Sequence, residues 1–286
     1  AWRASLSPGA VAMLHLLRAR RELESGDPSA YLAGLAAALR ATEQAGDARR
    51  ACAVRAELGE GYLLLGAWTH AEPALRQSLA AADSLGLPGT AVRALVPLSA
   101  VLALAGDADG ARRAALRAVE VDEAGHGRRL AGLAHTQLAR IELGAGHAEE
   151  AVQVAQRASE LLAPALPARA VALSVLSSAL LAARDLDQAL RVARQAVELV
   201  DTLFGIDDGE TGVRLCEAVA LDARGENEGA RAALGMTMAR LQERANRIRD
   251  AGWRNTYLRG VPDHARTLAL AAAWGMSPPS SRVAPL

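Results

Sequence analysis

A short turn signal recurs along this sequence at nearly constant intervals. Its central residues are Gly26, Gly66, Gly106, Gly146, Arg184 and Gly225. The steps between them are 40, 40, 40, 38 and 41 residues. A fixed period in this range is typical of an array of similar supersecondary units, each of which needs its neighbours in order to bury its apolar face.

Each turn separates two helical patterns. An apolar stretch such as AVALSVLSSALLA precedes it, and an amphipathic stretch such as LDQALRVARQAVELV follows, with apolar residues at i, i+3, i+4 and i+7. Hydrophobic residues make up 51% of the chain but aromatic residues only 3%, so the core consists of small aliphatic side chains that suit closely packed helices. We therefore predict an all-α fold, an α-solenoid of about seven antiparallel helix hairpins.

The turns divide the predicted array, residues 1–275, into units. We expect hairpins at about 7–46, 47–86, 87–126, 127–165, 166–205 and 206–248, a shorter capping unit at 249–275, and a flexible tail at 276–286. The capping unit differs in composition, with Trp253, Tyr257 and Trp274, as expected of a unit that covers an otherwise exposed face. The segment FGIDDGE, from Phe204 to Glu210, is the least regular connection, and we expect a bend or a contact loop there.

Local signals refine the expected helix ends. Glycine at the turn allows the left-handed residue that closes the first helix of a hairpin. Asp27, followed by proline, predicts an N-cap, and Thr69 with Glu72 predicts a capping box. Pro97 falls inside a helical pattern, where we expect it to kink the helix or shift its start.

Small residues stand at a constant offset before each turn. The residues seven positions before the turn are Ala19, Gly59, Ser99, Ala139, Ser177 and Ala218. Where the two helices of a hairpin cross, only a small side chain lets their axes approach to the usual packing distance of about 8–10 Å. We therefore expect these residues at the crossing points.

These offsets resemble the tetratricopeptide repeat (TPR) signature. The second unit carries the pattern best, as Leu58, Gly59, Tyr62, Gly66, Trp68, Ala71, Leu75 and Ser78. The resemblance covers about residues 8–248, although Arg184 replaces a turn glycine and Glu142 replaces an aromatic residue. It implies a right-handed superhelix whose period, near 40, exceeds the usual TPR period of about 34 residues.

The longer period resembles the helical arrays of large bacterial signalling proteins, such as ATPase-type transcription activators and serine/threonine kinases. This resemblance implies a non-catalytic scaffold that binds a protein or peptide and forms the regulatory C-terminal part of a larger protein. The alternative is a small-molecule-sensing array that controls an attached kinase, ATPase or transcription regulator. The sequence begins with Ala1 rather than Met, and we expect it to be a piece of a longer chain.

In TPR arrays the first helix of each hairpin lines a concave groove. Mapped onto this sequence, the candidate groove-binding residues are Arg20, Glu60, Arg93, Thr136, Arg140, Ser174 and Ser178. Arg93 and Arg140 have planar guanidinium groups that would suit a carboxylate or phosphate, or they are simply solvated side chains on a helix face. The Asn/Lys set with which TPR clamps bind a C-terminal carboxylate is absent. The other lining residues are largely apolar, which would suit an amphipathic helix or a neighbouring domain of the same polypeptide.

Several classes of function are disfavoured. The 32 basic and 32 acidic residues balance, so the net charge gives no footprint for nucleic acid, and every basic residue is arginine, which excludes chemistry that depends on lysine. No apolar run approaches the about 20 residues of a membrane span. The six histidines match no metal or catalytic motif, so we predict no catalytic residue, cofactor or metal. Cys52 and Cys216 are expected to be buried thiols, which favours the cytoplasm.

Overall fold

The computed structural model describes residues 7–123 and 127–276, and these residues form fourteen α-helices and no strand. The helices are α1 (Pro8–Glu24), α2 (Pro28–Gln44), α3 (Ala48–Leu64), α4 (Trp68–Ser84), α5 (Pro88–Leu104), α6 (Ala108–Glu123), α7 (Arg128–Gly144), α8 (Ala148–Leu161), α9 (Leu166–Ala182), α10 (Leu186–Thr202), α11 (Glu210–Ala223), α12 (Asn227–Arg247), α13 (Ala251–Gly260) and α14 (Pro262–Ala273). The predicted tail lies outside the described residues, apart from Met276.

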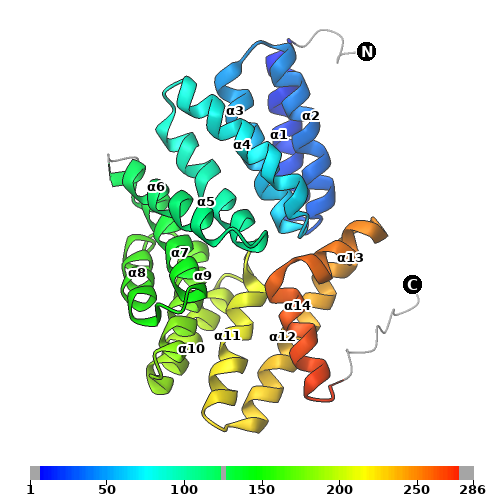
Figure 1. Ribbon diagram of the computed structural model, residues 1–286. Helices are drawn as coiled ribbons and strands as arrows, with labels where there is room; N and C mark the ends of the chain where they lie inside the picture. The colour runs from blue at the N-terminus through cyan, green and yellow to red at the C-terminus, as the bar shows by residue number, and fades with distance from the viewer. Residues whose placement is uncertain (1–6, 124–126, 277–286) are drawn as a thin grey trace, which may run out of the picture.

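The helices pack in the order in which they follow one another along the chain. Each helix lies against the next, from α1 on α2 to α13 on α14. The first helices of successive hairpins also pack side by side: α3 on α5, α5 on α7, α7 on α9 and α9 on α11. This is a stack of antiparallel helix hairpins (Figure 1), so the predicted all-α solenoid is confirmed.

The periodic turns end the first helix of each hairpin as expected. The turn residues all have a left-handed backbone: φ is +85° at Gly26, +74° at Gly66, +85° at Gly106, +84° at Gly146, +67° at Arg184 and +78° at Gly225. A side chain at such a position crowds the following carbonyl, which is why glycine is favoured there. Arg184 therefore carries a backbone strain that the five glycines avoid.

One prediction about a local signal was wrong, and one of the two effects expected of Pro97 does not occur. The capping box at Thr69 does not form, because α4 begins at Trp68 and its N-cap is Ala67, which makes no side-chain cap. The residue directly after the turn takes the N-cap position, as Asp27 does for α2, so the turn sets where the helix begins. Pro97 does not shift the start of its helix, since α5 runs from Pro88 to Leu104 with Pro97 inside it.

Small residues allow the close crossing of the paired helices. A Cβ atom placed on Gly59 of α3 would lie 2.5 Å from Leu75 Cγ of α4, closer than a real Cβ approaches another atom. Ala19 in α1 meets a glycine of α2 in the same way, because a Cβ on Gly34 would lie 2.7 Å from the Ala19 Cβ. Packing at this density makes any added methyl group costly.

The two ends of the array share one apolar cluster. Its buried residues include Tyr31, Leu35 and Leu58 from α2 and α3, together with Ile248 and Tyr257 from the end of α12 and from α13. Figure 1 shows α13 beside the lower ends of the first hairpins. We call this set the closing cluster. It means that the last helices, which were predicted to cap the array, also return to its beginning.

The strained turn gives a prediction about stability. Arg184→Gly removes the side chain at a left-handed residue, so the free energy of unfolding should rise by about 1 kcal/mol. The matched control is Arg191→Gly in the middle of α10, where glycine should lower stability by about 1 kcal/mol. Urea unfolding monitored by circular dichroism measures both changes, and a loss of stability in Arg184→Gly would contradict the prediction.

Candidate functional site

The first helices of neighbouring hairpins present one continuous surface. Because α3, α5, α7 and α9 pack side by side, side chains at equivalent positions on these helices face the same side of the array. Glu57 and Glu60 on α3, Arg93 on α5, and Arg129 and Arg140 on α7 carry charge on this side. We call these residues, together with Asp208, the inner face.

Arg93 is the centre of charge at the N-terminal end of the inner face. Its guanidinium lies 2.8 Å from the Glu57 carboxylate, which joins α5 to α3. Burial alone would lower the pKa of Arg93, but the carboxylates of Glu60 and Glu57 outweigh it and raise that pKa. Burial raises the pKa of Glu60 to about 7, although Arg93 opposes this, and Glu57 and Asp208 add to the rise by repulsion. The Arg93 guanidinium thus pairs directly with Glu57 and interacts electrostatically with Glu60.

Tyr31 is a buried residue of α2 that interacts electrostatically with these charged side chains. Its side chain is buried on α2, and burial, together with repulsion from Glu57 and Glu60, raises the pKa of its phenol. Arg20 on α1 and Arg93 act in the opposite direction, which places both close to this ring. The inner face therefore continues from α3 to the first hairpin.

The α10–α11 loop brings a carboxylate to the same side. Its Asp208 side chain reaches water at one side, yet partial desolvation by the protein around it raises the pKa of this carboxyl group, while the positive charges of Arg140 and Arg244 oppose that rise. Asp208 also acts on Glu60, so charged groups from α3, α7, α12 and this loop influence one another across the inner face.

Arg244 of α12 holds the loop in place. Its Nη1 donates to the Ile206 carbonyl at 2.5 Å and its Nη2 donates to the Asp207 carbonyl at 2.7 Å. Nη1 also lies 2.9 Å from the carboxylate of Glu210, whose side chain is only 4% exposed. Burial alone would raise the pKa of Glu210, but its hydrogen bond from Arg214 and the charge of Arg244 lower it. The loop presents Phe204, which is 92% exposed and has a φ of +58°.

The groove residues predicted from the sequence differ in their exposure and in their interaction partners. Arg20 and Arg140 are exposed, and neither makes an ion pair or hydrogen bond with any described residue. Glu60 and Arg93 are brought together through their charges. The other three use their hydroxyls locally: Thr136 donates to Gly132, Ser174 to Val171 and Ser178 to Ser174, all through backbone carbonyls of their own helices.

Sequence reasoning did not find three members of the inner face or the arginine that holds its loop. Glu57, Arg129, Asp208 and Arg244 were not among the predicted lining residues. Glu57 and Arg129 stand on first helices at offsets that were not considered, whereas Asp208 and Arg244 arrive through the α10–α11 loop and α12, which no repeat offset describes. The irregular composition of FGIDDGE was the one available signal for the loop.

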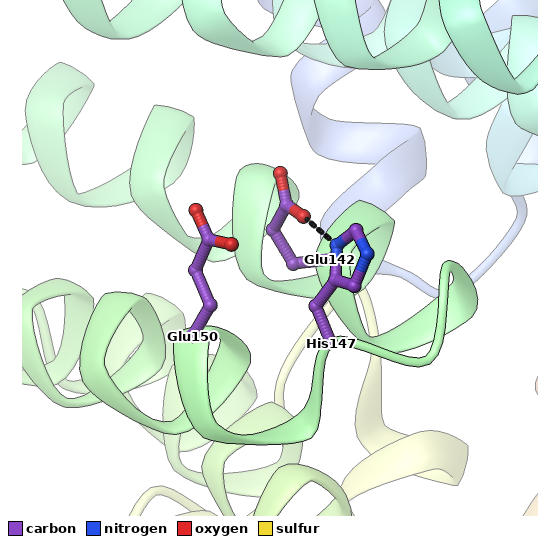
Figure 2. Close-up of side chains that lie close together, drawn as sticks. All are labelled: Glu142, His147 and Glu150. Atoms are coloured by element: carbon purple, nitrogen blue, oxygen red, sulfur yellow. Dashed lines mark hydrogen bonds and ion pairs between the residues drawn. The ribbon is translucent and has the colours of Figure 1, made fainter.

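A second group of polar side chains lies at the turn between α7 and α8. The potential ligand atoms of Glu142, His147 and Glu150 all lie within 4.8 Å of one another (Figure 2). Glu142 is fully buried, and its carboxylate is 2.7 Å from His147 Nδ1 and 2.8 Å from Nε of Arg112 on α6. Arg112 also lies 3.9 Å from Glu150. Since the Arg112 guanidinium already pairs with both carboxylates, this group acts as an ion-pair network that ties α6 to α7 and α8.

Comparison with known proteins bears on the fold. No known family model matches the sequence, and no curated protein matches it. Among solved structures, a Rap protein in complex with the competence and sporulation factor matches 95% of this chain and 78% of its own, with 12% identity and a TM-score of 0.68. Aspartyl phosphate phosphatase F from Bacillus subtilis matches 92% of this chain and 69% of its own, with 10% identity and a TM-score of 0.64.

A third similar structure contains a tetratricopeptide repeat region. It is a signal transduction ATPase with numerous domains and a tetratricopeptide repeat sensor, from Pyrococcus horikoshii, with 14% identity and a TM-score of 0.53 over 92% of this chain and 39% of its own. The fold is that of a TPR-like α-solenoid. At such low identities these likenesses establish the TPR-like fold alone, and the activities in the names belong to those proteins.

The structure also bears on two simpler predictions. Cys52 and Cys216 of the TPR-like array are both buried, as expected. Within the part of the chain that the structure describes, none of the helices has both the length and the apolar character that crossing a membrane requires.

The raised pKa of Glu60 predicts a pH dependence of stability. The ordinary pKa of 4.5 applies to the unfolded chain, and the folded protein keeps the proton up to about pH 7. Between these values the folded state binds more protons than the unfolded state, so the free energy of unfolding falls as the pH rises. Glu60→Gln does not titrate, so its stability relative to the wild type should increase from about pH 5 to about pH 7. Urea unfolding at several pH values tests this, and parallel curves for the two proteins would refute it.

The buried carboxylate of Glu142 gives a second prediction. Leucine or tyrosine occupies the equivalent position in four of the other five units, at Tyr62, Leu102, Leu180 and Leu221, and Glu22 stands there in the first unit. Arg112 and His147 have side chains 43% and 55% exposed, so both can turn to water when Glu142 is lost. Glu142→Leu should therefore keep or raise the free energy of unfolding, whereas Glu142→Ala, which leaves a cavity, should lower it by about 2–4 kcal/mol. Thermal and urea unfolding distinguish the two, and equal losses in both variants would contradict this account.

Proposed function

We propose that this TPR-like array is a non-catalytic protein-interaction module that binds an extended polypeptide segment along its inner face. The observation that carries the proposal is the set of charges there that stay unpaired. Arg20, Arg129 and Arg140 make no ion pair with any described residue, although the charge of Glu60 acts on Arg129 and that of Asp208 on Arg140. Because these oppositely charged side chains do not hydrogen-bond to each other, their N–H donors and carboxylate acceptors remain available to a ligand.

A polypeptide segment suits this surface chemically. Every residue of an extended chain offers one N–H donor and one C=O acceptor. Carboxylates such as Glu60 and Asp208 accept hydrogen bonds from N–H groups, and guanidinium groups such as Arg140 donate to carbonyl or carboxylate oxygens. The mixture of signs on the inner face thus matches the alternating polarity of a peptide backbone better than it matches a polyanion.

The solved structures support the same class of partner. The Rap protein that resembles this chain along most of its length was solved with the competence and sporulation factor bound. The TPR-like part of the Pyrococcus horikoshii ATPase is described as a sensor. We further propose that the present array acts in the cytoplasm, as the regulatory part of a larger bacterial signalling protein, and that its ligand is either a separate peptide or a segment of a neighbouring domain.

Selection from a random peptide library on the immobilised protein tests this function. Binders should emerge, and their affinity should drop at least about tenfold in Arg140→Ala, because a hydrogen bond to a charged group is lost. The matched control is Arg157→Ala on α8, a second helix of a hairpin, where among the described residues an exposed arginine pairs with Glu160 alone. Isothermal titration measures both. Failure to select any peptide, or peptides whose affinity is unchanged in Arg140→Ala, would overturn the proposal.

A further inference from the structure

The last helices meet the first two hairpins at their turns. The turn of the first hairpin, at Gly26 and Asp27, lies against Arg247 and Arg249 at the end of α12. The turn of the second hairpin, at Gly66, lies against the α13–α14 junction at Gly260 and Val261. We call these two meeting points the closing contact, and the closing cluster lies beside them.

At the second hairpin the two backbones touch. A Cβ atom on Gly260 would lie 2.4 Å from the Gly66 carbonyl oxygen, and a Cβ on Gly66 would lie 2.5 Å from the Gly260 carbonyl carbon. Gly260 is the last residue of α13 and its φ is not in the left-handed region, so its backbone would accept any residue. The absence of a side chain at this position therefore serves the contact with Gly66 and not the local conformation.

The closing contact is narrow compared with the rest of the array. Elsewhere, helices of adjacent hairpins pack along their lengths, whereas within the described residues α1–α4 meet α12–α14 through these turns and the closing cluster, without a comparable lengthwise pairing of helices. One buried oxygen of Asp27, Oδ2, has no hydrogen-bond partner there, and its nearest positive charge is Arg249 Nε at 3.7 Å. The side chain of Arg249 is 82% exposed, so this pair is weakly held. When the contact opens, Oδ2 of Asp27 becomes exposed and can accept hydrogen bonds from water.

The two sides of the closing contact also carry the two halves of the inner face. Glu57 and Glu60 stand on α3, nine and six residues before Gly66, whereas Arg244 stands on α12 close to Arg247 and holds the loop that bears Asp208. A molecule that touches both Glu60 and Asp208 therefore bridges the first and last parts of the array. Such a molecule binds the closed form better than an open form.

We propose that the closing contact is a releasable clasp, at which α12–α14 separate from the first two hairpins, and that ligand bound on the inner face holds it shut. The coupling to a ligand rests on the proposed function, but the clasp itself does not. When the clasp opens, α12 keeps its packing on α11, and α14 keeps its contacts with α11, α12 and α13, so the hairpins stay intact while the two ends part.

Distance measurement by pulsed electron paramagnetic resonance tests the clasp without any ligand. Spin labels are attached to cysteines introduced at Glu24 and Asn246, both exposed, while the native Cys52 and Cys216 are buried and stay unlabelled. The wild type should show two distances, a major short one and a minor long one. In Gly260→Ala, whose new methyl group collides with Gly66, the long distance should become the major one.

The matched control is Gly144→Ala. Gly144 is also the last residue of its helix, α7, but a Cβ there would meet no atom within 4 Å, so the distances should stay as in the wild type. Should Gly260→Ala fail to fold, as judged by circular dichroism, Arg249→Ala decides, because this exposed side chain can be removed without loss of the core; it should raise the long-distance fraction. A single short distance in the wild type and in Gly260→Ala, or in Arg249→Ala where Gly260→Ala does not fold, would overturn the clasp. Peptide selection can fail independently of this result.

Discussion

Close crossing of two helices within each hairpin is the constraint on which the rest of the structure depends. Gly59 faces Leu75, and Ala19 faces Gly34, at distances that admit no further carbon atom. This spacing brings the first helices into line, so that their side chains form one surface. The need for small side chains at the crossing points also explains why aromatic residues are rare. A large ring at any crossing point would push a hairpin out of register with its neighbours.

Much of this fold could be predicted from the sequence because its contacts are local. The turn at Gly66, the helix before it and the helix after it form within about 40 residues, and periodicity reports each of them. The wrong prediction at Thr69 also arose from a local signal. Thr69 has the spacing of a capping box, yet the left-handed Gly66 fixes the N-cap two residues earlier, and sequence spacing cannot rank the two signals.

The inner face could be predicted only where it follows the repeat. Glu60 and Arg140 were found because both stand six residues before a turn. Asp208 and Arg244 lie in segments without a repeat offset, and their place on the surface comes from Arg244 binding the carbonyls of Ile206 and Asp207. The return of α13 to the first hairpins could not be predicted at all, since it depends on the accumulated curvature of every preceding hairpin, which no single segment encodes.

The meeting of Gly66 with Gly260 also bears on how such a chain can evolve. An open solenoid tolerates the duplication or loss of a hairpin, because each unit contacts only its neighbours. Here the number of hairpins is tied to the circumference: one unit more or fewer would carry α13 past or short of the second turn. A chain closed in this way can vary residues within its units, but it cannot gain or lose a unit without breaking this contact, unlike an open linear array.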